Sequence, residues 1–291
     1  MLNRARRLAF TRGLLAVCPV LLCPGPPLFA AEGAREPDSA VAESAEPGPA
    51  WNGFRLDDAV IPKEKFAIGG VRDGVRAIDS PRFAGAEEAS QWVSPSMLVL
   101  GVQLGESARA YPERILDYHQ VVNDEIGERP IVVTWDPVSG VPLVFSRRLG
   151  DRSLHFGVSG LLYQSHSLIY DRETESLWSP FSGVAIAGPL KGEVLKRIPF
   201  SKEPAADWYS KHPRTRFLVR PFPKVIDYRR SPFAAHWSSP EIPFPVAATD
   251  PRFHPKEVVL GVSIGLVDRA YLGSVLTEAG GRIVDVVRGQ K

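Results

Sequence analysis

The sequence predicts an α+β protein that is β-rich, with mostly antiparallel sheet, short helices and a repeated hairpin-helix unit. Its apolar runs are short, and glycine and proline separate them at close intervals, which favours antiparallel sheets over strands that alternate with long helices. Residues 112–119 and 205–211 have the pattern of short helices. A hairpin followed by a helix is also expected twice along the chain, and these three observations together define the fold class.

Residues 1–30 have the three parts of a secretory signal peptide. Four arginines precede an apolar segment at residues 14–22, and small or turn-forming residues follow up to Ala30, after which we expect cleavage. Residues 31–50 are small, acidic and proline-containing, which predicts a flexible linker. Residues 51–291 are then expected to form a single composite β-rich domain. The signal peptide predicts that the mature protein is periplasmic or secreted.

Both cysteines, Cys18 and Cys23, lie inside the predicted signal peptide. Cleavage would leave a mature chain without a disulfide, a nucleophilic thiolate or a thiolate metal ligand. It would also remove four arginines and no acidic residue, so the mature chain would carry 31 basic and 33 acidic side chains.

The composition of the 291 residues excludes several classes of protein. Hydrophobic residues make up 44% and charged residues 23%, which is typical of a globular chain and not of a disordered or collagen-like one. A formal net charge of +2 offers no concentrated basic face for nucleic acid. No run of about 18 apolar residues is present, so we expect no transmembrane span.

Seven short apolar runs are expected to form strands. They are residues 97–104, 131–135, 143–145, 154–158, 168–170, 258–264 and 283–287. The helix predicted at residues 112–119 begins with proline, which suits the first helical position because its missing amide proton has no partner there. The proline-rich residues 221–255 predict an irregular covering loop.

One internal repeat relates the two ends of the predicted domain. Residues 98–111 and 258–271 are identical at eight of fourteen positions, with a constant offset from Gly101 to Gly261. Each copy predicts a β-hairpin that turns at a glycine and continues into a short helix. We expect the two copies to belong to one pseudo-symmetric sheet. His119 falls on the inward helix face, and its counterpart is Ala279, so packing alone does not require an imidazole there.

Residues 155–178 are the densest in polar and aromatic side chains. Residues 157–161 approximate the nucleophile elbow of a hydrolase, but the last glycine of that motif is missing and no clear helix follows. Ser159, His166 and Asp171 would supply the residue types of a catalytic triad. A tight turn is the more common role of such a glycine-serine-glycine segment, so the sequence does not favour a serine hydrolase.

Several motifs in order along the chain resemble a bacterial domain-of-unknown-function family, number 3179. They are residues 110–112 (AYP), His119, residues 122–124 (VND), 156–163 (FGVSGLLY), 170–172 (YDR), 176–179 (SLWS) and 188–190 (GPL), Gly192, Trp208, His212 and Pro213. The likeness runs from about residue 57 to 285 and includes the second repeat. It implies an exported or envelope-associated protein without an established activity.

The chain departs from this family at its sulfur-bearing positions. The family's Cys-x-x-Cys pair is replaced by Asp136 and Ser139, and a family methionine by Ile169. Thiolate and thioether groups are soft ligands that suit copper or zinc. Their joint replacement predicts that any soft-metal or thiol chemistry of the family is absent from this chain.

Two hypotheses about function follow, and a purely structural role is a third. The first is a non-catalytic binding or accessory module without a cofactor, which uses a polar pocket to bind a small molecule or an envelope protein. Its pocket would contain His119, Trp135, Asp136, Ser139, Ser159, Tyr163, Gln164 and His166. The second is a metal-dependent enzyme that holds zinc or copper through His119, Asp136 and His166.

Overall fold

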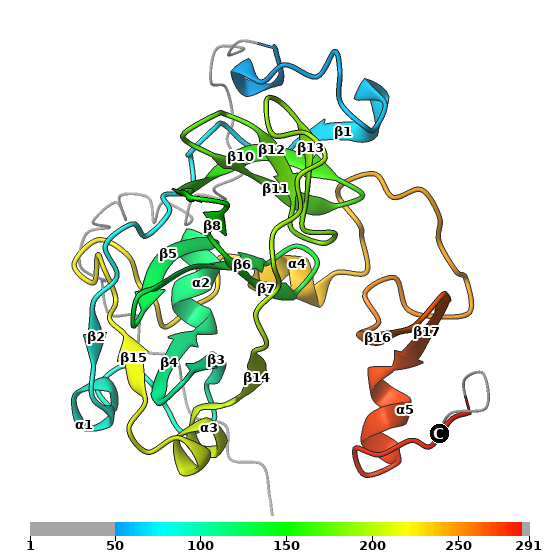
Figure 1. Ribbon diagram of the computed structural model, residues 1–291. Coiled ribbons are helices and arrows are strands. Elements are labelled where there is room, and N and C mark those ends of the chain that lie inside the picture. Colours follow the sequence, from blue (N-terminus) through cyan, green and yellow to red (C-terminus); the bar gives the residue numbers. More distant parts are fainter. Residues whose placement is uncertain (1–49, 287–291) are drawn as a thin grey trace, which may run out of the picture. The chain divides into compact units, whose positions relative to one another are not determined.

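The computed structural model describes residues 50–286. The predicted signal peptide, Cys18, Cys23 and all but the last residue of the predicted linker lie outside these residues. Strands outnumber helices, and most of them pair antiparallel, which confirms the β-rich α+β class (Figure 1). Within the part of the chain described, no helix is long and apolar enough to cross a membrane.

The strands form three main sheets. The first has the order β1-β10-β11-β12-β13, with bounds Phe66–Ile68, Phe156–Tyr163, His166–Asp171, Leu177–Ser179 and Val184–Ala187. The second has the order β14-β3-β4-β15-β2, with bounds Ser201–Pro204, Leu98–Leu104, Ser107–Pro112, Arg216–Leu218 and Phe83–Ala84. The third contains β5 (Val121–Ile126), β6 (Arg129–Asp136) and β7 (Val141–Ser146), and a small hairpin pairs β8 (Arg148–Leu149) with β9 (Arg152–Ser153).

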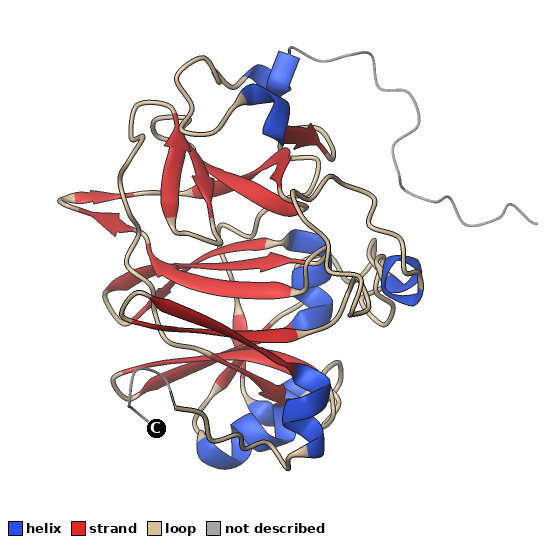
Figure 2. Cartoon of the chain, turned by 90° about the vertical axis from the view of Figure 1, so that its right-hand side faces the viewer, coloured by secondary structure: helices blue, strands red, loops and turns tan. Residues whose placement is uncertain are grey.

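The sheet of β5, β6 and β7 lies between the other two main sheets (Figures 1 and 2). Ile131 and Val133 of β6 pack in one apolar cluster with residues of β3, β4 and α2. Val132, between them, points to the other face and packs in a second cluster with residues of β10, β11 and β12. Because both faces are covered, β6 is a continuous apolar run and not an alternating one, and polar groups at its end must find partners inside the protein.

Helices are short and mostly lie at the ends of strands. They are α1 (Ala86–Ala89), α2 (Glu113–His119), α3 (Ala205–Lys211), α4 (Ala234–Ser238) and α5 (Gly273–Glu278), with 3₁₀ turns at Ala50–Gly53 and Lys63–Lys65. The sequence predicted α2 and α3, and Pro112 immediately precedes α2. The predicted covering loop at residues 221–255 is largely irregular, but it contains α4.

The two copies of the repeat have the same local structure. In the first copy, Gly101 of β3 pairs with Ala110 of β4; in the second, Gly261 of β16 (Val259–Ile264) pairs with Ala270 of β17 (Val267–Leu272). Both hairpins turn at a glycine, and a short helix follows each of them.

The predicted common sheet is wrong, however, because β16 and β17 form a two-stranded sheet of their own. No strand forms over residues 283–286 either, where the sequence predicted one; the last residue of that run lies outside the described part. Sequence identity between the copies specifies the hairpin and its register, but not the strands that pair with its edges.

The repeat provides a matched test of packing. A Cβ atom at Gly101 would overlap the buried ring of Trp208, whereas one at Gly261 would meet no atom within 4 Å. We expect Gly101→Ala to lower the free energy of unfolding by about 1–3 kcal/mol through overpacking. Gly261→Ala should change it by less than about 0.5 kcal/mol. Urea unfolding measures both, and equal losses in the two variants would contradict the packing described here.

Candidate binding site

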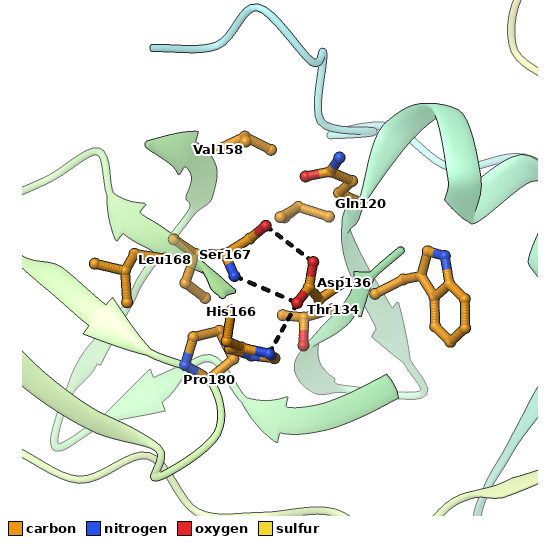
Figure 3. Close-up of a pocket in the computed structure, with 11 residues that line it drawn as sticks. Gln120, Thr134, Asp136, Val158, His166, Ser167, Leu168 and Pro180 are labelled. Carbon is orange, nitrogen blue, oxygen red and sulfur yellow. Dashed lines mark hydrogen bonds and ion pairs between the residues drawn. The ribbon is translucent and has the colours of Figure 1, made fainter. Parts of the chain in front are cut away.

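A polar cluster lies where the end of β6 meets the start of β11 (Figure 3). Asp136 is the last residue of β6, and the turn that leads to β7 carries Ser139. His166 and Ser167 begin β11, directly after the hairpin turn from β10. The tertiary structure therefore brings together Asp136, Ser139 and His166, three of the residues that the sequence singled out.

The carboxylate of Asp136 is the centre of this cluster, and its side chain is only 3% exposed. His166 Nδ1 lies 2.9 Å from Oδ2, and Ser139 Oγ donates to the same oxygen over 2.6 Å. Ser167 Oγ donates to Oδ1 over 3.0 Å (Figure 3). Backbone amides of Val138, Ser139 and Ser167 also donate to the carboxylate, over 3.2–3.4 Å.

These donors decide the charge of Asp136. Burial by itself raises the pKa of the carboxyl group because it disfavours the charged form. Hydrogen bonds from His166, Ser139 and Ser167 and the interaction with the imidazole outweigh burial, so the pKa of Asp136 lies below its usual value of 3.8. The carboxylate is therefore ionised at neutral pH.

The two ring nitrogens of His166 have different environments. Nδ1 faces the ionised carboxylate and lies 3.0 Å from Ser139 Oγ, whose proton is donated to Asp136. The hydrogen-bond network thus places a proton on Nδ1, and in the neutral form of the ring Nε2 is an acceptor. Nε2 is buried and has no hydrogen-bond partner among the residues that the structure describes. The ring of Phe181 packs edge-on against the imidazole, with 5.8 Å between ring centroids.

A cavity of about 10 Å³ adjoins the cluster (Figure 3). Its lining includes Gln120, Thr134, Asp136, His166, Ser167 and Pro180. This volume accommodates about one water molecule. Gln120 follows α2 with φ of +57°, a left-handed conformation that costs a non-glycine residue energy and is common at functional sites.

His119 belongs to a different environment. Its Nδ1 is 2.8 Å from the carbonyl oxygen of Arg76, its Nε2 is 2.8 Å from the hydroxyl of Tyr228, and it does not line the cavity. Burial lowers the pKa of His119 below its usual 6.5, partly opposed by the bond to Arg76. Both nitrogens are occupied, so His119 serves here to fix the covering loop to α2.

The other candidate residues have structural contacts in the described part of the chain. Trp135 lines the cavity and donates its Nε1 proton to Asp117, while Tyr163 pairs with His166 in the β10–β11 ladder. Gln164 lies in the intervening turn, and its side-chain oxygen accepts the amide proton of Ala247. None of these polar side chains bonds directly to the Asp136 carboxylate.

Ser159 does not form a triad with His166 and Asp171. It is fully buried within β10, and its hydroxyl donates to the carbonyl oxygen of Leu168. Asp171 instead accepts the Nε1 proton of Trp178. The segment is also not the tight turn that the sequence favoured, because it is a strand with a register shift at Gly160, where φ is +73°.

Among residues 50–286, no group of three or more histidine, cysteine, aspartate or glutamate side chains is arranged to hold a metal ion. His119 is held by Tyr228 and Arg76, whereas Asp136 and His166 bind each other. The suggested metal ligands therefore do not converge as a set in this structure.

Two members of the site, Ser167 and Gln120, were not predicted from the sequence. Ser167 directly follows His166. Because it is a polar residue next to a candidate ligand, the sequence could have suggested it as a member of the site. Gln120 directly follows His119, another candidate ligand, so the same signal applied to it, but its left-handed backbone conformation is visible only in the structure.

Comparison with known proteins identifies one relationship. Residues 72–291 match the sequence model of a family described as a protein of unknown function, DUF3179. Neither a curated protein nor a solved structure matches the chain. The match covers both copies of the repeat and all residues of the polar cluster.

Removal of the Asp136 carboxylate tests its central role. Asp136→Ala would leave buried donors on His166, Ser139 and Ser167 without an acceptor, so we expect a loss of about 3 kcal/mol in the free energy of unfolding. Ser139→Ala removes one of these bonds and should cost about 1 kcal/mol. Chemical denaturation measures both, and a loss in Asp136→Ala no larger than that in Ser139→Ala would contradict this account.

The lowered pKa of His119 predicts a dependence of stability on pH. The unfolded chain binds a proton near pH 6.5 and the folded chain only at lower pH, so stability is retained above 6.5 and falls as the pH drops below it. His119→Gln should reduce this slope by at most about 1.4 kcal/mol per pH unit, the value for one proton. Urea unfolding between pH 5 and 7.5 tests this, and identical slopes in variant and wild type would refute it.

Proposed function

This chain belongs to DUF3179, a family of proteins of unknown function, and on that premise we propose that it is a non-catalytic binding or accessory module of the bacterial cell envelope. The proposed site is the polar cluster of Asp136, Ser139 and His166. The observation that carries the proposal is the buried Nε2 atom of His166, which has no partner among the described residues. A buried polar atom without a partner costs about 1–3 kcal/mol, and a bound ligand can supply that partner.

The chemistry of the cluster defines what it binds. Asp136 carries a negative charge, and Nε2 accepts a hydrogen bond when the imidazole of His166 is in its neutral form. A donor group is therefore required, and a cationic donor gains an additional attraction. The cavity of about 10 Å³ admits one group the size of a water molecule. These features favour a single ammonium or hydroxyl group of a small molecule or an envelope protein.

The arrangement favours binding over catalysis. A serine nucleophile of a triad must face the histidine nitrogen opposite to the one that the carboxylate holds. Ser139 instead contacts Nδ1, the same nitrogen as Asp136, and the hydroxyl of Ser159 bonds to the main chain. Within residues 50–286, neither serine stands opposite the free nitrogen as a nucleophile would.

The proposal also depends on export, which the predicted signal peptide at residues 1–30 supports. The family resemblance implies a cysteine pair where this chain has Asp136 and Ser139. Carboxylate and hydroxyl groups are insensitive to thiol oxidation, so the cluster retains its charge in an oxidising compartment. We propose a periplasmic or secreted protein whose site binds through oxygen and nitrogen atoms.

Nuclear magnetic resonance of ¹⁵N-labelled histidine tests the site with methylammonium and methanol as probes. We expect His166 to be protonated at Nδ1 and the Nε2 signal to shift saturably with at least one probe. His166→Asn retains a donor toward Asp136 but lacks the distal nitrogen, so binding should be lost while the fold is kept. His155→Phe, a change at an exposed histidine, is the control. Absence of saturable shifts for both probes would refute the proposal.

Elemental analysis distinguishes this proposal from a zinc or copper site at His119, Asp136 and His166. Such a site would require His119 to leave its partners Tyr228 and Arg76. Protein that is loaded with zinc or copper and then dialysed should retain far less than one metal ion per chain. A stoichiometry near one that falls in the His166→Asn variant would contradict a metal-free binding module.

A further inference from the structure

A second and larger cavity lies in the covering loop, separate from the polar cluster. It has a volume of about 390 Å³, which falls in the range of small-molecule sites. Its lining includes Arg220, Lys224, Val225, Ile226, Asp227 and Tyr228. None of these residues lines the cavity beside His166.

The segment that contains the residues of this cavity is strongly basic in a chain that is otherwise close to neutral. Residues 214–230 contain six lysine or arginine side chains and one carboxylate, that of Asp227. Arg229 donates two hydrogen bonds, of 2.7 and 3.0 Å, to this carboxylate. Arg220 and Lys224 have no carboxylate within ion-pair distance among residues 50–286. Positive charge at the cavity is therefore not neutralised.

The base of the cavity is held in place by aromatic contacts. Tyr228 is 5% exposed, and its hydroxyl bonds to Nε2 of His119. The hydroxyl of Tyr118 lies 3.1 and 3.0 Å from the carbonyl oxygens of Asp227 and Arg230. The rings of Tyr118 and Tyr228 pack edge to face, with centroids 5.3 Å apart. These contacts anchor the loop to α2, so the cavity is formed before a ligand arrives.

The wall of the cavity is partly apolar. Val225 is 85% exposed, and Ile226 and Pro223 also line the cavity. An inorganic anion would use the cations but leave these side chains in contact with water. A ligand that also covers the apolar wall gains from its burial.

We propose that the cavity formed by residues 220–229 binds a small organic anion, with its carboxylate or phosphate group at Arg220 and Lys224 and its apolar body against Val225 and Ile226. Guanidinium groups suit both kinds of anion because their planar donors match two oxygen atoms at once. This site is independent of the proposed function of the Asp136 and His166 cluster.

Isothermal titration calorimetry with four probes tests the site on the whole protein. Benzoate and phenyl phosphate combine the anion with an apolar body, inorganic phosphate lacks the body, and benzyl alcohol lacks the charge. We expect saturable binding of benzoate or phenyl phosphate, and the stronger of the two identifies the preferred anion. Inorganic phosphate and benzyl alcohol should bind at least several-fold more weakly. Failure of both organic anions to bind, or equal binding of benzyl alcohol, would overturn the proposal.

Charge reversal at Lys224 tests whether the organic anion binds in this cavity. Lys224 is exposed and has no ion-pair partner in the described part, so Lys224→Glu should fold normally. By Coulomb's law in water, reversal of a charge about 6 Å from the anion weakens binding on the order of tenfold. Lys196→Glu makes the same change at another exposed lysine and should leave binding unchanged, as should His166→Asn. Equal affinity in Lys224→Glu and Lys196→Glu would place the anion elsewhere and refute the assignment.

Discussion

The buried negative charge of Asp136 is the constraint on which the candidate site depends. The charge lies at the end of β6, a strand whose two faces are both covered by apolar clusters. A carboxylate in such a place is stable only if donors inside the protein surround it. Ser139, His166 and Ser167 are those donors, and they come from two hairpins of different sheets. The charge thus links the central sheet to its neighbour.

The hydrogen bonds that the Asp136 carboxylate accepts also determine the chemistry of His166. Because Nδ1 is committed to the carboxylate, the imidazole is fixed in one orientation and presents Nε2 as its remaining polar atom. Oriented acceptors of this kind occur in both enzymes and binding proteins, and the groups around them distinguish the two. Here the nearby hydroxyl contacts Nδ1 together with the carboxylate, which is consistent with a site that receives a donor rather than activates a nucleophile.

The internal repeat shows which features the hairpin itself requires and which features are required only by the residues that pack against it. Both copies have the same pairing register and the same turn glycine, although their neighbours differ completely. Gly101 must be small because Trp208 covers it, whereas Gly261 meets no such limit. His119 is likewise a feature of the first copy alone, where the covering loop supplies Tyr228 and the chain supplies the carbonyl of Arg76.

The sequence by itself determined the β-rich class, the helices α2 and α3, the hairpin that each copy of the repeat forms, and the family. These properties depend on local spacing of apolar residues, glycine and proline, and on short motifs. Only the tertiary structure decided which candidate residues meet. It joined Asp136, Ser139 and His166, bonded His119 to Tyr228 of the covering loop, and placed β16 and β17 outside the main sheets. The reason is physical: strand pairing and the neutralisation of a buried charge depend on groups far apart in the chain, and local sequence does not encode their distances.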